Sequence, residues 1–348
     1  MNKLLSIVVP VYKVEQYIRK CLDSLIVSDE LMDQLEVIVV NDGTPDRSAI
    51  IAKEYEKKYP QTFRVIDKEN GNYGSCINRG LKEARGKYIR ICDGDDSYDT
   101  ESFAKFLRTL ECIDADLFLT DYVVVDNDGQ VTEHNDISSV RKKMPVGKVF
   151  NLQEYLRSTD YAYTPQMHCT TYRTSLLRDM GYHQTEGISY TDIQWATLPI
   201  TRVRTAFYQP AEVYRYLLGR EGQTMDANNQ IKNVRHLYQM LLDMAEFYQR
   251  GDYDTFYKPF IKLVFERNMY SFYPDVILFC HGDAKALSDF DERLKKYPDL
   301  YCLFSSHTHL HGLINYVGLW RRRDYKKLPW LYRKIGGWLE MRGRKCWK

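Results

Sequence analysis

Strand-like and helix-like segments alternate from residue 6 to residue 92, and this alternation restricts the fold more than any other feature of the 348-residue chain. Runs rich in β-branched residues predict strands over residues 6–11, 35–40, 63–67 and 87–92. Apolar residues at helical spacing predict helices over residues 15–26, 46–59 and 74–85, with Asp46 as a cap and Gly86 as a stop. Strands that alternate with helices build a mainly parallel sheet covered on both faces. The sequence therefore predicts an α/β fold of the Rossmann-like kind.

The rest of the chain follows a different pattern. Strand-like segments at residues 117–125, 203–208 and 213–217 are mixed with short helical stretches. Long helical patterns follow at residues 233–248 and 254–272. We expect one large domain over residues 1–225, a helical C-terminal region over 226–319 and a basic, aromatic tail over 320–348.

Three carboxylates follow the fourth predicted strand, at Asp93, Asp95 and Asp96. Carboxylates this close repel one another, so their clustering favours a bound cation or a nucleotide hydroxyl. Asp42 follows the second predicted strand, and ligands of such sheets bind beyond the carboxyl ends of the strands. The sequence therefore predicts one site for a metal-bridged phosphate. The alternatives are an acidic turn in which Asp96 caps the next helix, and an ordinary turn at Asp42 and Gly43.

Four sequence blocks carry a resemblance to a known family. They lie at residues 6–12, 39–46, 69–81 and 93–96, and they include Asn-Asp-Gly at 41–43 and Asp-Gly-Asp-Asp at 93–96. In this order and spacing the chain resembles a family 2 glycosyltransferase of the GT-A fold. The match covers about the first 100 residues and continues more weakly to about residue 225.

This resemblance implies a nucleotide diphosphate sugar donor, commonly a uridine one, and transfer to a hydroxyl with inversion at the anomeric carbon. Asp42 would accept a hydrogen bond from the base, and Asp93 would supply the first carboxylate of the family's Asp-x-Asp pattern. Asp95 would face the ribose or the metal, and Asp96 would bind Mg²⁺ or Mn²⁺. The implied nucleotide-binding residues are Pro10, Val11, Tyr12, Asp42, Asn72, Asp93 and Asp95.

The resemblance also implies a general base and a phosphate contact. Asp192 matches the family's base at the start of a short helix, although Thr191 stands where the family often has Glu. Helix capping by Asp192 is the alternative. Arg220 and Gln223 lie in a segment that resembles a lid near the donor phosphates. A plain loop with a surface Arg is the alternative there.

The tail differs sharply in charge from the rest of the chain. Residues 320–348 carry eleven Lys or Arg against two acidic residues, although the whole chain has a net charge of only +2. Aromatic and aliphatic residues interleave with these cations, which is typical of a segment lying on an anionic bilayer. Nucleic-acid binding uses the same ingredients, but no recognised motif accompanies them, so we predict no nucleic-acid partner. Docking of the tail on the acidic remainder of the chain is the alternative.

Eight cysteines without a Cys-x-x-Cys pair favour a reducing cytosol. Together with the tail and the resemblance, this predicts a cytoplasmic enzyme, peripheral on the inner face of the plasma membrane, that extends a lipid-linked glycan. One alternative is a sugar-1-phosphate nucleotidyltransferase, but residues 11–15 lack the glycine-rich, lysine-containing loop of that class. A non-catalytic subunit that binds nucleotide or glycan is the second alternative. The sequence indicates no oligomeric state.

Overall fold

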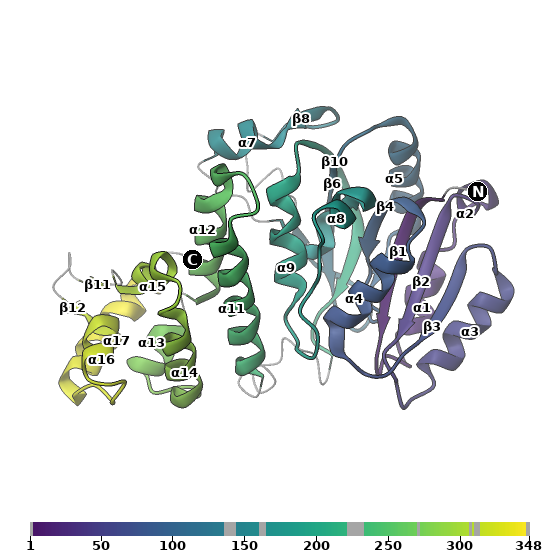
Figure 1. The fold of residues 1–348 in the computed structure, drawn as a ribbon. Coiled ribbons are helices and arrows are strands. Elements are labelled where there is room, and N and C mark those ends of the chain that lie inside the picture. Colours follow the sequence, from purple (N-terminus) through teal and green to yellow (C-terminus); the bar gives the residue numbers. More distant parts are fainter. Residues whose placement is uncertain are drawn as a thin grey trace. The chain divides into compact units, whose positions relative to one another are not determined.

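The computed structural model describes residues 3–135, 144–159, 165–220, 233–269, 272–305, 308–309 and 314–345 (Figure 1). The chain divides into two compact units, Met1–Asp226 and Ala227–Lys348. The first unit contains a ten-stranded mixed sheet flanked by helices, and the second is helical apart from a two-stranded sheet. The predicted α/β fold with a helical C-terminal region is confirmed.

The large sheet has the strand order β3-β2-β1-β4-β9-β6-β10-β5, with β7 beside β6 and β8 beside β10. Its strands are β1 (Lys3–Val11), β2 (Leu35–Asn41), β3 (Phe63–Asp67), β4 (Gly86–Ile91), β5 (Ser97–Tyr98), β6 (Leu117–Val125), β7 (Val131–Asn135), β8 (Val149–Asn151), β9 (Thr170–Arg173) and β10 (Thr205–Leu217). β1, β2, β3 and β4 pair in parallel, as do β6 and β10, whereas β9 runs antiparallel between β4 and β6. All residues of β2 and β6 are buried, as expected for strands covered on both faces.

Helices cover this sheet (Figure 1). They are α1 (Ile18–Ser24), α2 (Asp29–Met32), α3 (Ser48–Lys58), α4 (Asn72–Glu83), α5 (Thr100–Cys112), α7 (Leu152–Ser158), α8 (Thr174–Asp179) and α9 (Asp192–Thr197), with 3₁₀ turns η1 (Met167–Cys169) and η2 (Pro199–Arg202). The N-cap of α3 is Arg47 rather than the predicted Asp46, although the side chain of Asp46 accepts a hydrogen bond from the Ser48 backbone N–H. Gly86 begins β4, and α4 ends at Glu83.

β10 joins two segments that the sequence separates. Residues 203–208 and 213–217 were expected as two strands, but β10 runs without a break from Thr205 to Leu217. It stays paired with β6 because bulge-like shifts in register between Gln209 and Tyr214 accommodate the residues that the sequence placed between two strands. β10 can therefore pair with β8 near its start and with β5 near its end. β5 directly follows residues 93–96, which are called the acidic loop below.

The parallel strands fix where a site can form. Val11 at the end of β1 pairs with Asn41 at the end of β2, and Val8 of β1 pairs with Ile91 at the end of β4. The residues that follow these strands therefore leave the sheet at one edge. Asp42 and the loop from Asp93 to Asp96 are among them.

The C-terminal unit contains α11 (Val234–Arg250), the 3₁₀ turn η3 (Thr255–Tyr257), α12 (Lys258–Met269), α13 (Phe272–Ile277), α14 (Ala284–Leu294), α15 (Pro298–Ser305), α16 (Tyr316–Arg322) and α17 (Trp330–Lys345). Strands β11 (Thr308–His309) and β12 (Ile314–Asn315) form its small sheet. In its interior, Arg321 forms an ion pair with fully buried Asp291, which also accepts a hydrogen bond from Tyr273. Trp320 is buried beside Tyr273. The first residues of the predicted tail thus belong to this core, and the exposed apolar residues lie farther along, on α17.

Among the described residues, no helix combines the length and the apolar composition that a membrane crossing requires.

The contact between α4 and β1 gives a test of this packing. A methyl group on Gly80 of α4 would lie 2.4 Å from Cγ1 of Val8, in the centre of β1. We expect Gly80→Ala to lower the free energy of unfolding by about 1–2 kcal/mol, because the helix must move away from the sheet. Urea unfolding followed by circular dichroism measures the change. Lys82→Ala, at an exposed position of the same helix, should stay within about 0.5 kcal/mol of the wild type. Equal losses in the two variants would contradict this account of the packing.

Candidate active site

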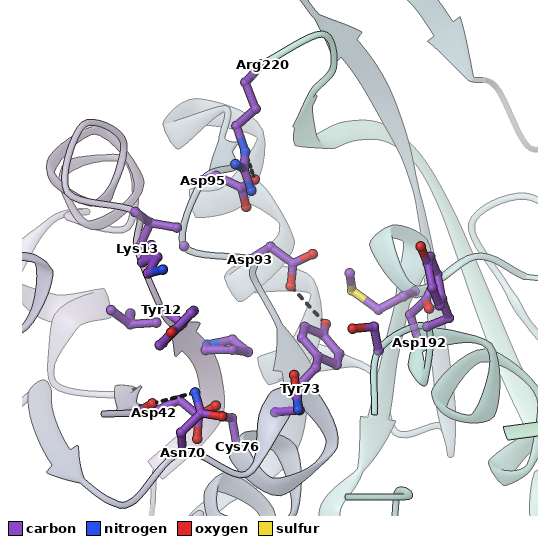
Figure 2. Close-up of a pocket in the computed structure, with 18 of the residues that line it drawn as sticks. Tyr12, Lys13, Asp42, Asn70, Tyr73, Cys76, Asp93, Asp95, Asp192 and Arg220 are labelled. Atoms are coloured by element: carbon purple, nitrogen blue, oxygen red, sulfur yellow. Dashed lines mark hydrogen bonds and ion pairs between the residues drawn. The ribbon is translucent and has the colours of Figure 1, made fainter. Parts of the chain in front are cut away.

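A cavity of about 440 Å³ opens at the carboxyl edge of the parallel strands (Figure 2). It gathers residues from the ends of β1, β2 and β4, the start of α4, and the segments that carry η1, α9 and the end of β10. Nine of the predicted site residues line it: Pro10, Val11, Tyr12, Asp42, Asn72, Asp93, Asp95, Asp192 and Arg220. Asp96 lies next to the cavity rather than in its wall, and Gln223 lies outside the described residues.

Asp42 is buried at the floor of one end of the cavity. Its Oδ1 accepts hydrogen bonds from Nζ of Lys68, at 2.6 Å, and from the backbone N–H of Gly71, at 2.9 Å. Asn70 donates to the Asp42 carbonyl oxygen at 3.0 Å. These contacts hold the carboxylate in one position, and the lysine compensates its charge.

Tyr12 presents a half-exposed ring at the same end of the cavity. The Lys13 ammonium lies 5.2 Å from the centre of this ring. Lys13, Asn72 and Tyr190 all line the cavity and all have positive φ angles, near +60°, which residues with side chains rarely adopt. Backbone strain of this kind is maintained only where the surrounding structure enforces it, and it concentrates at functional sites.

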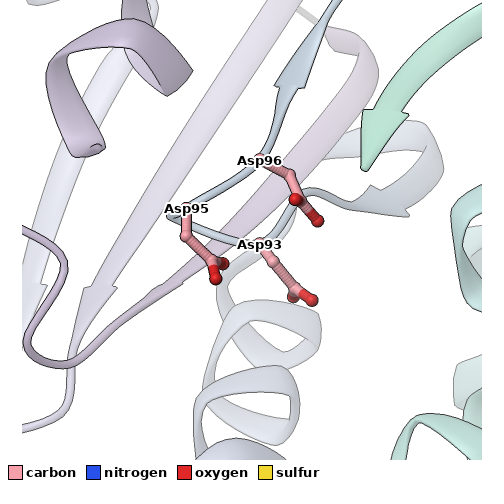
Figure 3. Close-up of side chains that lie close together, drawn as sticks. All are labelled: Asp93, Asp95 and Asp96. Atoms are coloured by element: carbon pink, nitrogen blue, oxygen red, sulfur yellow. The ribbon is translucent and has the colours of Figure 1, made fainter. Parts of the chain in front are cut away.

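The three carboxylates of the acidic loop converge (Figure 3). Asp93, Asp95 and Asp96 each offer an oxygen, and these oxygens lie within 4.8 Å of one another. The two oxygens of Asp96 already accept hydrogen bonds, one from the Tyr214 hydroxyl at 2.6 Å and one from the Leu217 backbone N–H at 2.7 Å. Asp96 therefore ties the acidic loop to β10, while Asp93 and Asp95 line the cavity.

Asp93 lies between Asp95 and Asp192 in the cavity (Figure 2). The Tyr73 hydroxyl donates a hydrogen bond to Oδ1 of Asp93 at 2.8 Å. Burial, reinforced by the nearby charge of Asp95, raises the pKa of Asp93 to about 7. In the absence of a cation, this carboxyl group retains its proton close to neutral pH.

Asp95 is paired with Arg220. Nε of Arg220 lies 2.5 Å from Oδ2 of Asp95, and the guanidinium also lies 5.6 Å from the centre of the Tyr17 ring. Arg220 follows the end of β10 by three residues, so the strand that Asp96 anchors also delivers the arginine.

Asp192 is the first residue of α9 and lines the cavity together with Asp93 and Asp95 (Figure 2). The protein around the cavity raises the pKa of Asp192 by excluding water from the carboxylate, and the backbone N–H groups of Asp192 and Ile193 oppose this effect. A carboxylate with a raised pKa is a stronger base than a fully solvated one. Thr191, which stands where the family often has Glu, is fully buried, and its hydroxyl accepts a hydrogen bond from Gln184 at 2.9 Å.

The segment before α9 is held against α4 by main-chain contacts. The Gly187 N–H donates to the Gly71 carbonyl at 2.8 Å, and a Cβ on Gly74 would lie only 2.0 Å from the Thr185 carbonyl oxygen. Asn78 of α4 exchanges hydrogen bonds with the Gln184 backbone in both directions. The position of Asp192 relative to the end of the cavity with Asp42 therefore depends on α4.

Sequence reasoning missed three residues with clear contacts in or beside the site. Lys68 donates a hydrogen bond to Asp42, and Tyr73 donates one to Asp93. His168 lines the cavity, and its carbonyl oxygen accepts a hydrogen bond from buried Arg90. Burial, reinforced by the charge of Arg90, lowers the pKa of His168 to about 3. Tyr73 lies inside the block at 69–81 and Lys68 immediately precedes it, so their positions were available as a signal, but their roles were not. No local pattern marks His168.

Comparison with known proteins identifies the family. A family model described as "Glycosyl transferase family 2" matches residues 6–181, just over half of the chain. The chain belongs to glycosyl transferase family 2. It is 44% identical over 111 residues to the uncharacterized glycosyltransferase EpsJ of Bacillus subtilis, a stretch that covers 32% of this chain and 31% of EpsJ. The chain thus matches about a third of the length of that curated relative.

Solved structures share the fold over nearly the whole chain. S. aureus TarS 1-349, in complex with UDP-GlcNAc, has a TM-score of 0.63 at 19% identity, covering 92% of each chain. The mannosyltransferase PcManGT from Pyrobaculum calidifontis, in complex with GDP-Man and Mn²⁺, has a TM-score of 0.53 at 16% identity, covering 97% of this chain and 84% of its own. These similarities establish the GT-A fold that the sequence predicted.

The raised pKa of Asp93 predicts how stability depends on pH. The folded protein holds a proton on Asp93 up to about pH 7, whereas the unfolded chain releases it near 3.8. Between these values the folded state binds more protons, so in the presence of a chelator the free energy of unfolding should fall as pH rises. Asp93→Asn should reduce this fall by up to roughly 1.4 kcal/mol per pH unit. Urea unfolding between pH 4.5 and 7.5 measures the slope, with exposed Asp128→Asn as the control. Identical slopes in wild type and Asp93→Asn would contradict the assignment.

Proposed function

We propose that this protein is an inverting glycosyltransferase that moves a sugar from a nucleotide diphosphate sugar to a hydroxyl group of a growing glycan. The observation that carries the proposal is that one cavity collects Asp42, the Asp93–Asp95 pair and Asp192, each from a different part of the chain. A donor-binding carboxylate, a charged centre for a diphosphate and a base on the far side are the three parts that such a transfer needs.

The nucleotide is assigned to the end of the cavity formed by Tyr12, Asp42 and Asn72. The Tyr12 ring offers a flat surface for a base, and the fixed Asp42 carboxylate can accept a hydrogen bond from a base N–H. The UDP-GlcNAc bound by TarS supports a uridine donor, because the two proteins share this fold. Pro10 and Val11 complete the wall beneath the nucleotide.

The acidic loop suits a divalent cation. Mg²⁺ and Mn²⁺ prefer oxygen ligands and often use only one or two protein carboxylates together with phosphate oxygens. Asp95 and Asp93 face the cavity and would hold the cation, whereas Asp96, predicted from the sequence as a ligand, has both oxygens engaged by Tyr214 and Leu217 and would join only after rearrangement. When bound, such a cation stabilises the negative charge that develops on the leaving diphosphate. Mn²⁺ in PcManGT supports this choice of metal.

Asp192 is the proposed general base. Its carboxylate would take the proton from the acceptor hydroxyl as that oxygen attacks the anomeric carbon from the face opposite the diphosphate. The enclosed setting that raises the pKa of Asp192 strengthens it for this role. Arg220 would contact the diphosphate, since its planar guanidinium matches phosphate oxygens.

A panel of nucleotide sugars with Mn²⁺ or Mg²⁺ tests the activity through release of nucleotide diphosphate. We expect release with a uridine donor and loss of release with a chelator. Formation of pyrophosphate from a sugar 1-phosphate and a nucleoside triphosphate would instead favour a nucleotidyltransferase. Nucleotide binding without turnover of any donor would instead identify the protein as a non-catalytic binding subunit.

Asp192→Asn tests the base. The variant should lose at least about 10²-fold in transfer rate while its affinity for UDP stays within error, because the amide cannot take a proton. Steady-state kinetics and UDP titration calorimetry provide the two readouts. Asp179→Asn, an exposed carboxylate outside the cavity, should leave both unchanged. Full transfer activity in Asp192→Asn would eliminate this residue as the base.

We further propose that the acceptor is lipid-linked and that the enzyme works on the cytoplasmic face of an anionic membrane through α17. Five large apolar residues of this helix are between 43% and 63% exposed: Trp330, Leu331, Ile335, Trp338 and Met341. At 100° per residue they fall on one face. Gly336, on the opposite face, packs against Leu278, and Gly337, at the edge of the apolar face, packs against Phe279. Lys334 lies over the Trp330 ring, so positive charge accompanies the apolar face, as an anionic lipid surface requires.

A double variant tests this surface without removing the buried residues Trp320 and Arg321. Trp330→Glu with Ile335→Glu should abolish sedimentation with vesicles containing phosphatidylglycerol, because it places negative charge in the apolar face. Ile50→Glu, at an apolar residue of similar exposure on α3, is the matched control and should sediment like the wild type. Undiminished sedimentation of the double variant would refute the role of α17.

A further inference from the structure

The ion pair between Arg220 and Asp95 occupies the place where the proposed site needs its cation. Their side chains are only 17% and 13% exposed, so the pair is largely shielded from water. The other two carboxylates of the loop have partners elsewhere, Asp93 in Tyr73 and Asp96 in Tyr214. Among the described residues, Asp95 is paired with Arg220 alone.

We infer that Arg220 is a built-in counter-ion that neutralises Asp95 while the donor is absent and exchanges places with the divalent cation when a nucleotide diphosphate binds. The inference rests on the proposed function. It assigns to Arg220 a second role, distinct from its contact with phosphate.

The geometry of the pair makes the two cations competitors. Nε of Arg220 donates to Oδ2 of Asp95, so one of the two oxygens that this carboxylate could offer to a metal ion is already engaged. A guanidinium and a divalent cation bound to the same carboxylate would repel each other, and the shielding of the Arg220–Asp95 pair from water would strengthen this repulsion. Binding of metal to the free protein must therefore break the ion pair and leave Arg220 without a partner.

A diphosphate removes this penalty. In the present arrangement the two terminal nitrogens of Arg220 make no hydrogen bonds within the described part of the chain, and an arginine can offer them to phosphate as a fork. The displaced guanidinium would thus exchange one anionic partner for another. Metal and nucleotide should then strengthen each other's binding by the same factor, as linkage requires.

The surroundings give the arginine room to move. Arg220 and Asp95 also line a second cavity of about 480 Å³ on the other side of the pair, together with Tyr17, Lys20 and Asn127. Gly219, with a φ of +95°, precedes the arginine, and within the described part of the chain no atom lies within 4 Å of the position of a Cβ there. The guanidinium can therefore change partners without displacing packed side chains.

Titration with Mn²⁺, followed by electron paramagnetic resonance with and without UDP, tests the inference without measuring activity. Without UDP, Arg220→Gln should bind Mn²⁺ about tenfold more tightly than the wild type, because the competing cation is gone. UDP should raise the Mn²⁺ affinity of the wild type by a larger factor than that of Arg220→Gln. Arg220→Lys, which can still pair with Asp95, should resemble the wild type when UDP is absent. Arg19→Gln removes the same charge from an exposed ion pair with Glu54 and should change nothing.

Equal Mn²⁺ affinities of wild type and Arg220→Gln without UDP would overturn the inference. An equal effect of UDP on both proteins would also overturn it, because a counter-ion that stays in place beside the metal leaves the coupling unchanged. Either result leaves the proposed transfer reaction intact. Failure of the wild type to bind Mn²⁺ even with UDP would instead refute both this exchange and the metal-dependent part of the proposed function.

Discussion

Mutual repulsion among Asp93, Asp95 and Asp96 is the constraint on which the rest of the site depends. Three carboxylates whose oxygens approach within 4.8 Å cannot remain together without compensation. Each is compensated by a different part of the chain: Asp93 by Tyr73 at the start of α4, Asp96 by the end of β10, and Asp95 by Arg220 beyond that strand. The same loop that carries the charge therefore draws the elements around the cavity together.

The compensation also explains why the two halves of the cavity have different characters. The end with Tyr12 and Asp42 has a carboxylate fixed by a lysine and a backbone N–H, so its charge is compensated before any ligand binds. The end with Asp93 and Asp95 has an ion pair and a carboxyl group with a pKa of about 7, so its charge can change when a cation or an anion binds. In the proposed function, the first of these regions would recognise the nucleotide base and the second would accommodate the leaving diphosphate.

The sequence allowed the fold and the cavity wall to be predicted to a large extent, because both depend on local patterns. Alternation of strands and helices determined the parallel sheet, and the carboxyl ends of its strands located Asp42 and the acidic loop. The contacts of Lys68, Tyr73 and His168 depend on which elements meet in three dimensions, and no spacing along the chain reveals that. The division of the tail also depends on three-dimensional contacts: Trp320 and Arg321 pack into the helical unit, whereas Trp330 remains exposed. The sequence alone therefore did not predict where the tail leaves the core. The predicted domain boundaries and the roles of the individual site residues stay predictions.

The close approach at Gly74 has a consequence for how such a site can change over time. The Gly187 N–H bonds to the Gly71 carbonyl, and Gly74 lies against the Thr185 carbonyl oxygen. At these two points main-chain atoms set the spacing between α4 and the segment before Asp192. Residues elsewhere in the cavity wall can then be replaced while the spacing between α4 and Asp192 stays constant. The missing side chain at Gly74 thus keeps the geometry of the cavity constant while its lining can change.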